Sequence, residues 1–206
     1  MKVTASSAVS APSALAPSRA RRIAEPIGVV LLGTLFLAIC AHVSVPLWFT
    51  PVPITLQTFA VLLLALLLGP GLAAATMVAY LVEGAAGLPV FSPVGGVTSL
   101  HLFGPTAGYL LSYPAAAWLT GLLFRRFRQI DAPGFVAALG AAGIGSCLIL
   151  LSGAAWLAIL THQSAATVLT LAVAPFLAGD VLKLIAAAGI ASGWRRFRRV
   201  ASSTPE

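Results

Sequence analysis

Residues 125–160 read RRFRQIDAPGFVAALGAAGIGSCLILLSGAAWLAIL and join a cluster of arginines to a long apolar run. Residues 134–160 of this stretch carry no charge. A helix needs about 20 mostly apolar residues to cross about 30 Å of hydrocarbon, so this run is long enough to span a membrane. Short cytoplasmic loops collect Lys and Arg. The stretch therefore predicts a transmembrane helix that leaves the cytoplasmic side.

The rest of the chain has the same pattern of apolar runs between small clusters of charge. Of its 206 residues 59% are hydrophobic and only 8% are charged, whereas soluble domains carry roughly 25% charged residues. The net charge of +7 does not indicate a nucleic-acid partner, because the basic residues flank apolar runs instead of forming a stripe interleaved with aromatics. We therefore predict an all-α integral membrane protein in a lipid bilayer.

Hydropathy divides the chain into one membrane domain and two tails. Six transmembrane helices are predicted, over residues 23–45, 54–69, 71–88, 104–124, 134–160 and 166–194. They form a domain over 23–194, between a disordered cytoplasmic tail over 1–22 and a basic cytoplasmic tail over 195–206. A cleaved signal peptide is the alternative for the first run. That run is long for such a role and lacks a clear small-x-small cleavage site, so we expect a retained helix.

The arginine clusters give an independent check on this topology. They precede the first predicted helix, follow the fourth and follow the sixth, and they consist of Arg19/Arg21/Arg22, Arg125/Arg126/Arg128 and Arg195/Arg196/Arg198/Arg199. An even number of predicted spans separates each pair of clusters, so all three fall on one side. The segments predicted on the other side, 46–53, 89–103 and 161–166, contain no Lys or Arg. Both termini are therefore predicted to be cytoplasmic.

Asp180 and Lys183 are the ionisable residues of greatest interest inside the predicted spans. They are three positions apart, which places them on one helical face. Two hypotheses fit them: a structural ion pair, or a site with a carboxylate acceptor and an ammonium donor for a small solute that has an anionic end and N–H donors. Pro175 can bend or open the helix just before the pair. Gly179 allows close approach by another helix or a ligand.

Three further groups of polar residues are weaker candidates. Gln57 is expected to face the bundle, either as a link between helices or as a ligand contact. Glu83 lies late in the third helix, where it is either functional or only interfacial. The scattered histidines predict no metal site. No nucleotide-binding loop, nucleophile elbow or HExxH motif is present, so we predict neither an enzyme nor a bound cofactor.

Several ordered motifs resemble the BioY family, the biotin-capturing S components of energy-coupling factor (ECF) transporters. They are TPVPITLQT at 50–58, GLPVF at 87–91, Gly95-Gly96, GPTAGY at 104–109, Pro175-Phe176 and GDVLK at 179–183. The resemblance implies a six-helix S-component fold with biotin near the outer face, under the loops after helices one and three. It also implies that Asp180 accepts from the ureido ring and that Lys183 binds the biotin carboxylate. Tyr109, Gly95, Gly96 and Gln57 complete the implied binding set.

Two positions depart from the family pattern. Val94 and Leu110 stand where some members have a polar residue and an arginine that contact biotin, so those contacts are not carried over. Ser92, Thr98 or Ser99 could replace the lost ureido contact. An S component for another small vitamin therefore stays open as an alternative, as does, from a different class, a membrane enzyme that uses Asp180 and Lys183 as an acid–base pair.

The resemblance also implies partners and a location. The family's partners are a transmembrane coupling subunit and two cytoplasmic ATPases, although some members are thought to work alone. The chain is accordingly expected to be a multi-pass protein of the bacterial cytoplasmic membrane. It would bind and carry biotin, which is its ligand and not a cofactor.

Overall fold

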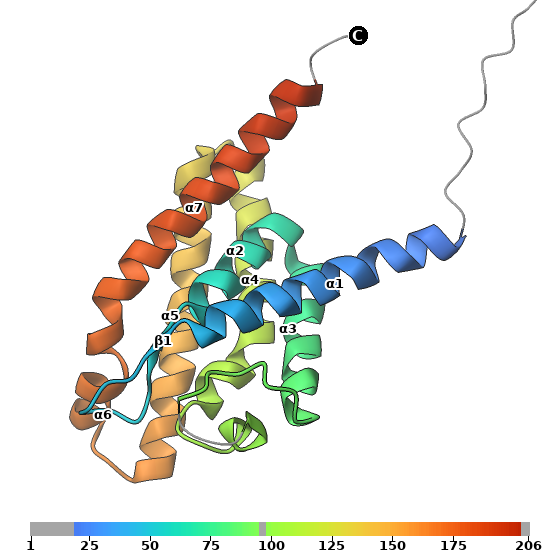
Figure 1. The fold of residues 1–206 in the computed structure, drawn as a ribbon. Coiled ribbons are helices and arrows are strands. Elements are labelled where there is room, and N and C mark those ends of the chain that lie inside the picture. Colours follow the sequence, from blue (N-terminus) through green and yellow to red (C-terminus); the bar gives the residue numbers. More distant parts are fainter. Residues whose placement is uncertain (1–18, 95–97, 203–206) are drawn as a thin grey trace, which may run out of the picture.

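The computed structural model describes residues 19–94 and 98–202 and is built almost entirely of helices (Figure 1). The predicted N-terminal tail lies mostly outside these residues. In chain order the elements are α1 (Arg19–His42), β1 (Ser44–Val45), β2 (Ile54–Thr55), α2 (Gln57–Leu68), α3 (Pro70–Ala85), the 3-10 helix η1 (Thr98–Leu102), α4 (Ala107–Gln129), α5 (Gly134–Thr161), α6 (Ala165–Ala172) and α7 (Ala174–Ser202).

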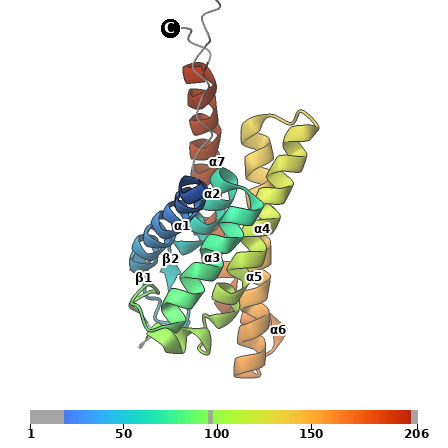
Figure 2. The same ribbon diagram turned by 90° about the vertical axis from the view of Figure 1, so that its right-hand side faces the viewer.

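The helices form a bundle around the pair α4 and α5, which run antiparallel along most of their length (Figures 1 and 2). Helix α3 packs along α4, and α7 packs on α2 and α5. Helix α1 crosses α2 and α3 obliquely (Figure 1). The α4–α5 turn and the C-terminal end of α7 lie at one end of the bundle, and the short strands, η1 and α6 lie at the other (Figure 2). The bundle therefore has two chemically distinct ends.

Exposed apolar side chains cover the outside of this bundle. Leu32 of α1 and Leu182 of α7 are both more than two-thirds exposed, and other large apolar side chains on the same helices are about half exposed. Such a surface is suited to lipid and not to water. Among the described residues, four helices are long and apolar enough to cross a membrane: α1, α4, α5 and α7. The chain is thus a membrane protein.

The connection between the first two helices is longer than predicted. Residues 44–45 and 54–55, which were assigned to helices, instead form β1 and β2, a two-stranded antiparallel ribbon. Pro46 explains the early end of the first helix, because proline pushes the residue before it out of the helical region, and residues 54–55 are extended because they pair with 44–45. Helix α2 starts only at Gln57, whose backbone N–H donates to Thr55 Oγ1 at 3.3 Å.

The boundaries of the third and fourth helices also differ from prediction. Helix α3 ends at Ala85 instead of residue 88, because Gly87 adopts a left-handed backbone with φ of 90° and Pro89 follows. Helix α4 starts at Ala107 instead of residue 104, after the Gly104-Pro105 turn. The connection between them is correspondingly longer, and its residues 98–102 form η1.

The predicted sixth helix over 166–194 is wrong as a continuous element. It is broken at Val173 into α6 and α7. Pro175 has no N–H to continue the α6 hydrogen-bond pattern, and its ring disfavours helical continuation from the preceding turn. The bend that the sequence predicts near Pro175 is therefore present, and it lies one and a half to two turns before Asp180.

Three helices extend beyond their apolar runs. Helix α1 starts at Arg19, α4 continues to Gln129 and α7 continues to Ser202. Hydropathy locates the part of a helix that lies in hydrocarbon, whereas the backbone hydrogen bonds continue through an arginine-rich turn without penalty. The arginines after the fourth and sixth runs are consequently helical.

Candidate functional site

A cavity of about 50 Å³ lies at the end of the bundle that carries the strands and η1. This ligand cavity, as we call it, is bounded by residues from the β1–β2 connection, α2, the loop after α3, α4, α5 and α7, and its lining includes all four of the predicted site residues that the structure describes. Those four residues are Gln57, Tyr109, Asp180 and Lys183. Residues more than 120 positions apart therefore meet at one site.

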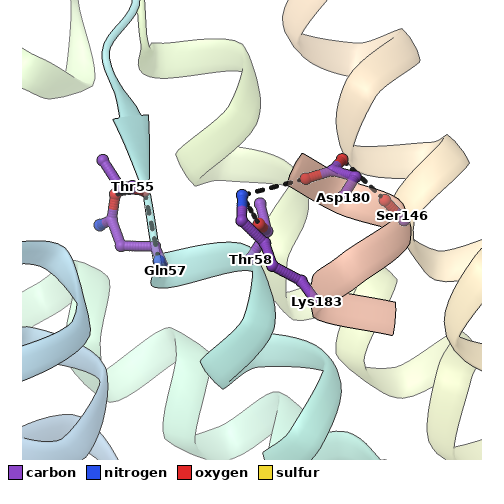
Figure 3. Close-up of polar contacts among 6 residues, drawn as sticks. All are labelled: Thr55, Gln57, Thr58, Ser146, Asp180 and Lys183. Carbon is purple, nitrogen blue, oxygen red and sulfur yellow. Dashed lines mark hydrogen bonds and ion pairs between the residues drawn. The ribbon is translucent and has the colours of Figure 1, made fainter. Parts of the chain in front are cut away.

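The ion pair between Asp180 and Lys183 forms the polar wall of the ligand cavity (Figure 3). Lys183 Nζ donates to Asp180 Oδ1 at 3.0 Å and to Thr58 Oγ1 of α2 at 3.1 Å. Ser146 of α5 donates its hydroxyl to the other carboxylate oxygen, Asp180 Oδ2, at 3.1 Å. Three helices thus supply one hydrogen-bonded group of four side chains.

Burial makes this charge pair expensive unless both members have partners. Asp180 is 5% exposed and Lys183 is 9% exposed. Charges at that depth are stable only when they are paired and hydrogen-bonded. Here the carboxylate accepts two hydrogen bonds and the ammonium donates two. A ligand with both N–H donors and an anionic group could give the carboxylate new hydrogen-bond donors and the ammonium a new counter-ion.

Aromatic side chains form the apolar walls. Tyr109 and Phe176 lie with their ring centroids 6.2 Å apart, and both line the ligand cavity. The Tyr109 hydroxyl donates to the carbonyl of Ala172 at 2.6 Å. That carbonyl lies at the α6–α7 break, where the backbone N–H of Phe176 bonds to Val173 instead. Tyr109 therefore satisfies a carbonyl that the break leaves without its helical partner.

Gln57 links helices, as one of the two roles considered for it requires, and it also lines the cavity, where contact with a ligand stays a prediction. Its side-chain amide donates to the Tyr80 hydroxyl at 2.8 Å, and that hydroxyl donates to the carbonyl of Val90 at 2.8 Å. Phe91, the next residue, packs edge-on against Tyr80 with ring centroids 5.2 Å apart. Through this chain of contacts, α2 and α3 hold the loop after α3 against the cavity.

The remaining predicted residues have different outcomes. Gly95 and Gly96 lie outside the described residues, and so do the side chains of Thr98 and Ser99. Ser92 and Leu110 line the cavity, whereas Glu83 and Val94 do not. Glu83 is partly exposed near the end of α3.

Several lining residues were not identified from the sequence. Tyr113 is one helical turn after Tyr109, so the four-residue spacing of the two tyrosines was a usable signal. His101 also lines the cavity, and its Nε2 lies 3.1 Å from the carbonyl oxygen of Val94. Thr58, which lines the cavity, and Ser146, which lies behind Asp180 outside the lining, carry no comparable signal, because their contacts with the ion pair depend on how three helices pack.

Comparison with known proteins gives consistent results. The model of the BioY family matches residues 10–200. A probable biotin transporter BioY from Pyrococcus horikoshii is 34% identical over 82% of this chain and 94% of its own length. Biotin transporter BioY from Rhodobacter capsulatus is 37% identical over 82% of this chain and 91% of its own. The corresponding protein from Thermotoga maritima is 35% identical over 77% and 88%.

A solved structure has the same fold. It is the crystal structure of the S-component for biotin from an ECF-type ABC transporter, which superposes with a TM-score of 0.78 at 24% identity and covers 88% of this chain and 95% of its own. The family model spans most of the chain and several relatives agree along most of their length. This chain therefore belongs to the BioY family.

Proposed function

We propose that this chain captures biotin and mediates its uptake as the substrate-binding S component of an ECF-type transporter. The observation that carries the proposal is the buried Asp180–Lys183 pair on the wall of the ligand cavity, in a chain whose relatives are named biotin transporters. Biotin has a ureido ring with two N–H donors and a carboxylate at the end of an aliphatic chain. Its polar groups are complementary to the two charged residues.

In this proposal Asp180 accepts from the ureido ring and Lys183 binds the carboxylate. These two groups lie at opposite ends of biotin, whereas Lys183 Nζ and Asp180 Oδ1 are 3.0 Å apart. Binding would therefore separate the pair, and the four-carbon lysine stem allows its ammonium to move. Ser146 would keep its hydrogen bond to Asp180 and hold the carboxylate in place. Lys183 would exchange one carboxylate for another, and Asp180 would exchange the ammonium for neutral N–H donors that still satisfy its oxygens.

The size of the cavity adds a requirement. At about 50 Å³ it is several times larger than the roughly 10–15 Å³ that one water molecule needs, but it is smaller than a cavity of about 150 Å³ that binds a single benzene ring. We therefore propose that the loop after α3, which Gln57 and Tyr80 hold in place, moves outward when biotin enters.

Labelled-biotin binding to the purified chain tests this function directly. We expect saturable binding at or below micromolar concentration, and absence of binding at that concentration would refute the proposal. Mass spectrometry of whatever copurifies should identify biotin, whereas a different vitamin would favour the alternative S component, which Val94 and Leu110 keep open. A membrane enzyme would convert its bound ligand, so recovery of unchanged biotin distinguishes transport from catalysis.

The membrane arrangement is part of the same proposal. We infer six spans, with α2 and α3 completing the count set by α1, α4, α5 and α7, and with α6 and α7 forming the sixth. At 1.5 Å per residue the 12 residues of α2 cover only about 18 Å, so its neighbours would cover the rest of its depth. Both termini would face the cytoplasm of a bacterial cell, and the ligand cavity would lie near the outside. Reporter fusions at each terminus test this orientation.

The energy source is proposed from the resemblance alone. A transmembrane coupling subunit and two cytoplasmic ATPases would reorient the chain, or it would act without them. Biotin uptake measured with and without the coupling subunits separates the two cases. Uptake that needs the subunits supports the first, and equal uptake in both conditions supports the second.

A further inference from the structure

A second cavity, of about 680 Å³, lies at the opposite end of the bundle. We call it the arginine cavity, because Arg128 of α4 and Arg195, Arg196 and Arg198 of α7 line it. Of the residues that the structure describes, none that lines this cavity is acidic, and Asp131 of the neighbouring α4–α5 turn is outside the lining. Four positive charges therefore converge on one cavity whose described lining supplies no negative charge.

Arg195 is held in place by the fold. One of its guanidinium nitrogens donates to the carbonyl of Leu66 at 3.0 Å. The helical partner of that carbonyl would be residue 70, which is proline and has no N–H to donate. The Arg195 guanidinium also lies over the ring of Phe124, 4.6 Å from its centroid. Its position is thus set by α2 and α4 before any ligand arrives.

Arg128 reaches the cavity from α4, whereas the other three arginines belong to α7. Its side chain is partly buried, and it donates to the carbonyl of Ala132 at 3.0 Å. A guanidinium has five N–H donors in a planar fork that matches phosphate oxygens, so one bond to a carbonyl does not exhaust its capacity. Arg196 and Arg198 are exposed on α7 and complete the set. Two of the four arginines, one on α4 and one on α7, are therefore held by hydrogen bonds to the backbone, and two exposed arginines of α7 can adjust to a ligand.

Apolar side chains accompany the charges. Leu67, Phe124 and Trp194 line the same cavity, and Trp194 is 53% exposed. Phe197, on the same turns of α7, is 68% exposed. A Trp beside arginines at the end of an apolar helix is typical of the depth at which lipid headgroups meet acyl chains. The site offers binding to a phosphate and to hydrocarbon together.

We propose that the arginine cavity binds the headgroup of an anionic phospholipid, with its phosphate among the four guanidinium groups and its acyl chains along α7. A free phosphate ion would use the arginines but not the apolar wall. An acidic segment of a protein partner would have to compete with the lipid that surrounds this depth of the bundle. Anionic lipids are attracted to clustered Lys and Arg at a membrane surface. The proposal concerns neither biotin nor its cavity.

Native mass spectrometry of the full chain in non-ionic detergent tests this site, with phosphatidylglycerol, phosphatidylcholine and inorganic phosphate as separate probes. We expect the first phosphatidylglycerol to bind at least tenfold more tightly than phosphatidylcholine. Each arginine near such a headgroup contributes roughly fivefold. The Arg128→Gln/Arg196→Gln/Arg198→Gln variant should lose the preference. Arg126→Gln, an exposed arginine of α4 outside the cavity lining, is the matched control and should keep it.

The Arg196→Gln/Arg198→Gln variant provides a second measurement if loss of the Arg128 bond impairs folding, because it should retain the fold and still lose much of the preference. Labelled-biotin binding and thermal unfolding verify the fold of each variant. Equal binding of the two lipids, or an equal loss in Arg126→Gln, would overturn the proposal. So would complete competition by millimolar inorganic phosphate, which would indicate a site for the free ion. A triple variant that keeps its lipid preference but no longer assembles with coupling subunits would indicate a protein partner and would also overturn it.

Discussion

Helix α7 carries cationic side chains at both ends of the molecule, and the surroundings of these side chains differ. Lys183 lies in the ligand cavity, where Asp180, Ser146 and Thr58 form a closed group with it. Arg195 lies three helical turns later, in a cavity that no described acidic residue lines. A buried cation is tolerated only beside its counter-ion, whereas a cation at the membrane surface is stabilised by water and anionic headgroups. The difference agrees with the two proposals, that biotin displaces a paired cation at one end and that a lipid headgroup binds the arginines of the lining at the other.

Removing the carboxylate should have the largest effect. Asp180→Ala takes away the ureido acceptor and leaves the Lys183 ammonium without its counter-ion. Loss of one partner of a buried charge pair costs about 2–5 kcal/mol, so we expect biotin binding to weaken at least about 30-fold. Equilibrium binding measures this change. Asp180→Asn preserves the volume and one acceptor oxygen, so it should lose less, and equal losses would contradict the proposed role of Asp180 as a hydrogen-bond acceptor for the ureido ring.

Biotin binding should be next most sensitive to the close packing of Gly153 against Tyr109. Gly153 of α5 lies against the Tyr109 ring so closely that an added Cβ would overlap it. Gly153→Ala should displace the ring from Ala172 and weaken biotin binding by about tenfold, a loss of roughly 1.4 kcal/mol typical of mild overpacking. Gly143→Ala on the same helix meets nothing within 4 Å and is the matched control. Similar effects of the two substitutions would show that helix propensity, and not the ring, is responsible.

A pair of serines compares the two cavities directly. Ser146→Ala removes the hydroxyl that donates to Asp180, and a hydrogen bond to a charged group contributes about 1.5–3 kcal/mol at most when fully buried. Because Asp180 keeps its other partner, we expect only a several-fold loss of biotin affinity by isothermal titration. Ser192→Ala in the arginine cavity, where the hydroxyl donates to its own helix at Ala188, should leave affinity unchanged. An equal loss of biotin affinity in both variants would mean that the effect does not come from the hydrogen bond to Asp180.

The smallest effect is expected from the arginines. Arg196→Gln and Arg198→Gln together should change biotin affinity by less than about twofold, because distant sites without shared partners act independently. Equilibrium binding of labelled biotin in detergent, without lipid, is the measurement. A large change would mean that the two ends are coupled through α7 and would contradict their independence.

The membrane character of the fold could be predicted from the sequence, whereas the helix ends could not. Apolar runs identified the cores of α1, α4, α5 and α7, since hydropathy is a property of each residue alone. The β1–β2 ribbon at 44–55 was missed because it depends on pairing between two short segments. Pro175 did mark the α6–α7 break, which follows from local backbone chemistry. Features set by local chemistry could be predicted from the sequence, whereas pairing between separate segments could not.

The same division applies to the candidate site. The three-residue spacing of Asp180 and Lys183 predicted their contact, which the structure contains at 3.0 Å. Thr58 and Ser146 reach that pair from other helices, and no spacing within the chain encodes such an approach. Tyr113 could have been predicted from Tyr109, one turn earlier on the same face. Sequence therefore identified the charged centre, and packing determined its surroundings.

The most direct test of the account compares biotin with biotin amide in the Lys183→Ala variant. If Lys183 binds the biotin carboxylate, the variant should lose at least about fivefold more affinity for biotin than for the uncharged amide, since a charge-assisted hydrogen bond exceeds a neutral one by about 1 kcal/mol or more. Lys183→Met, which keeps much of the stem, should give the same difference. Equal losses for the two ligands, or unchanged biotin affinity, would contradict the assignment of Lys183 to the carboxylate.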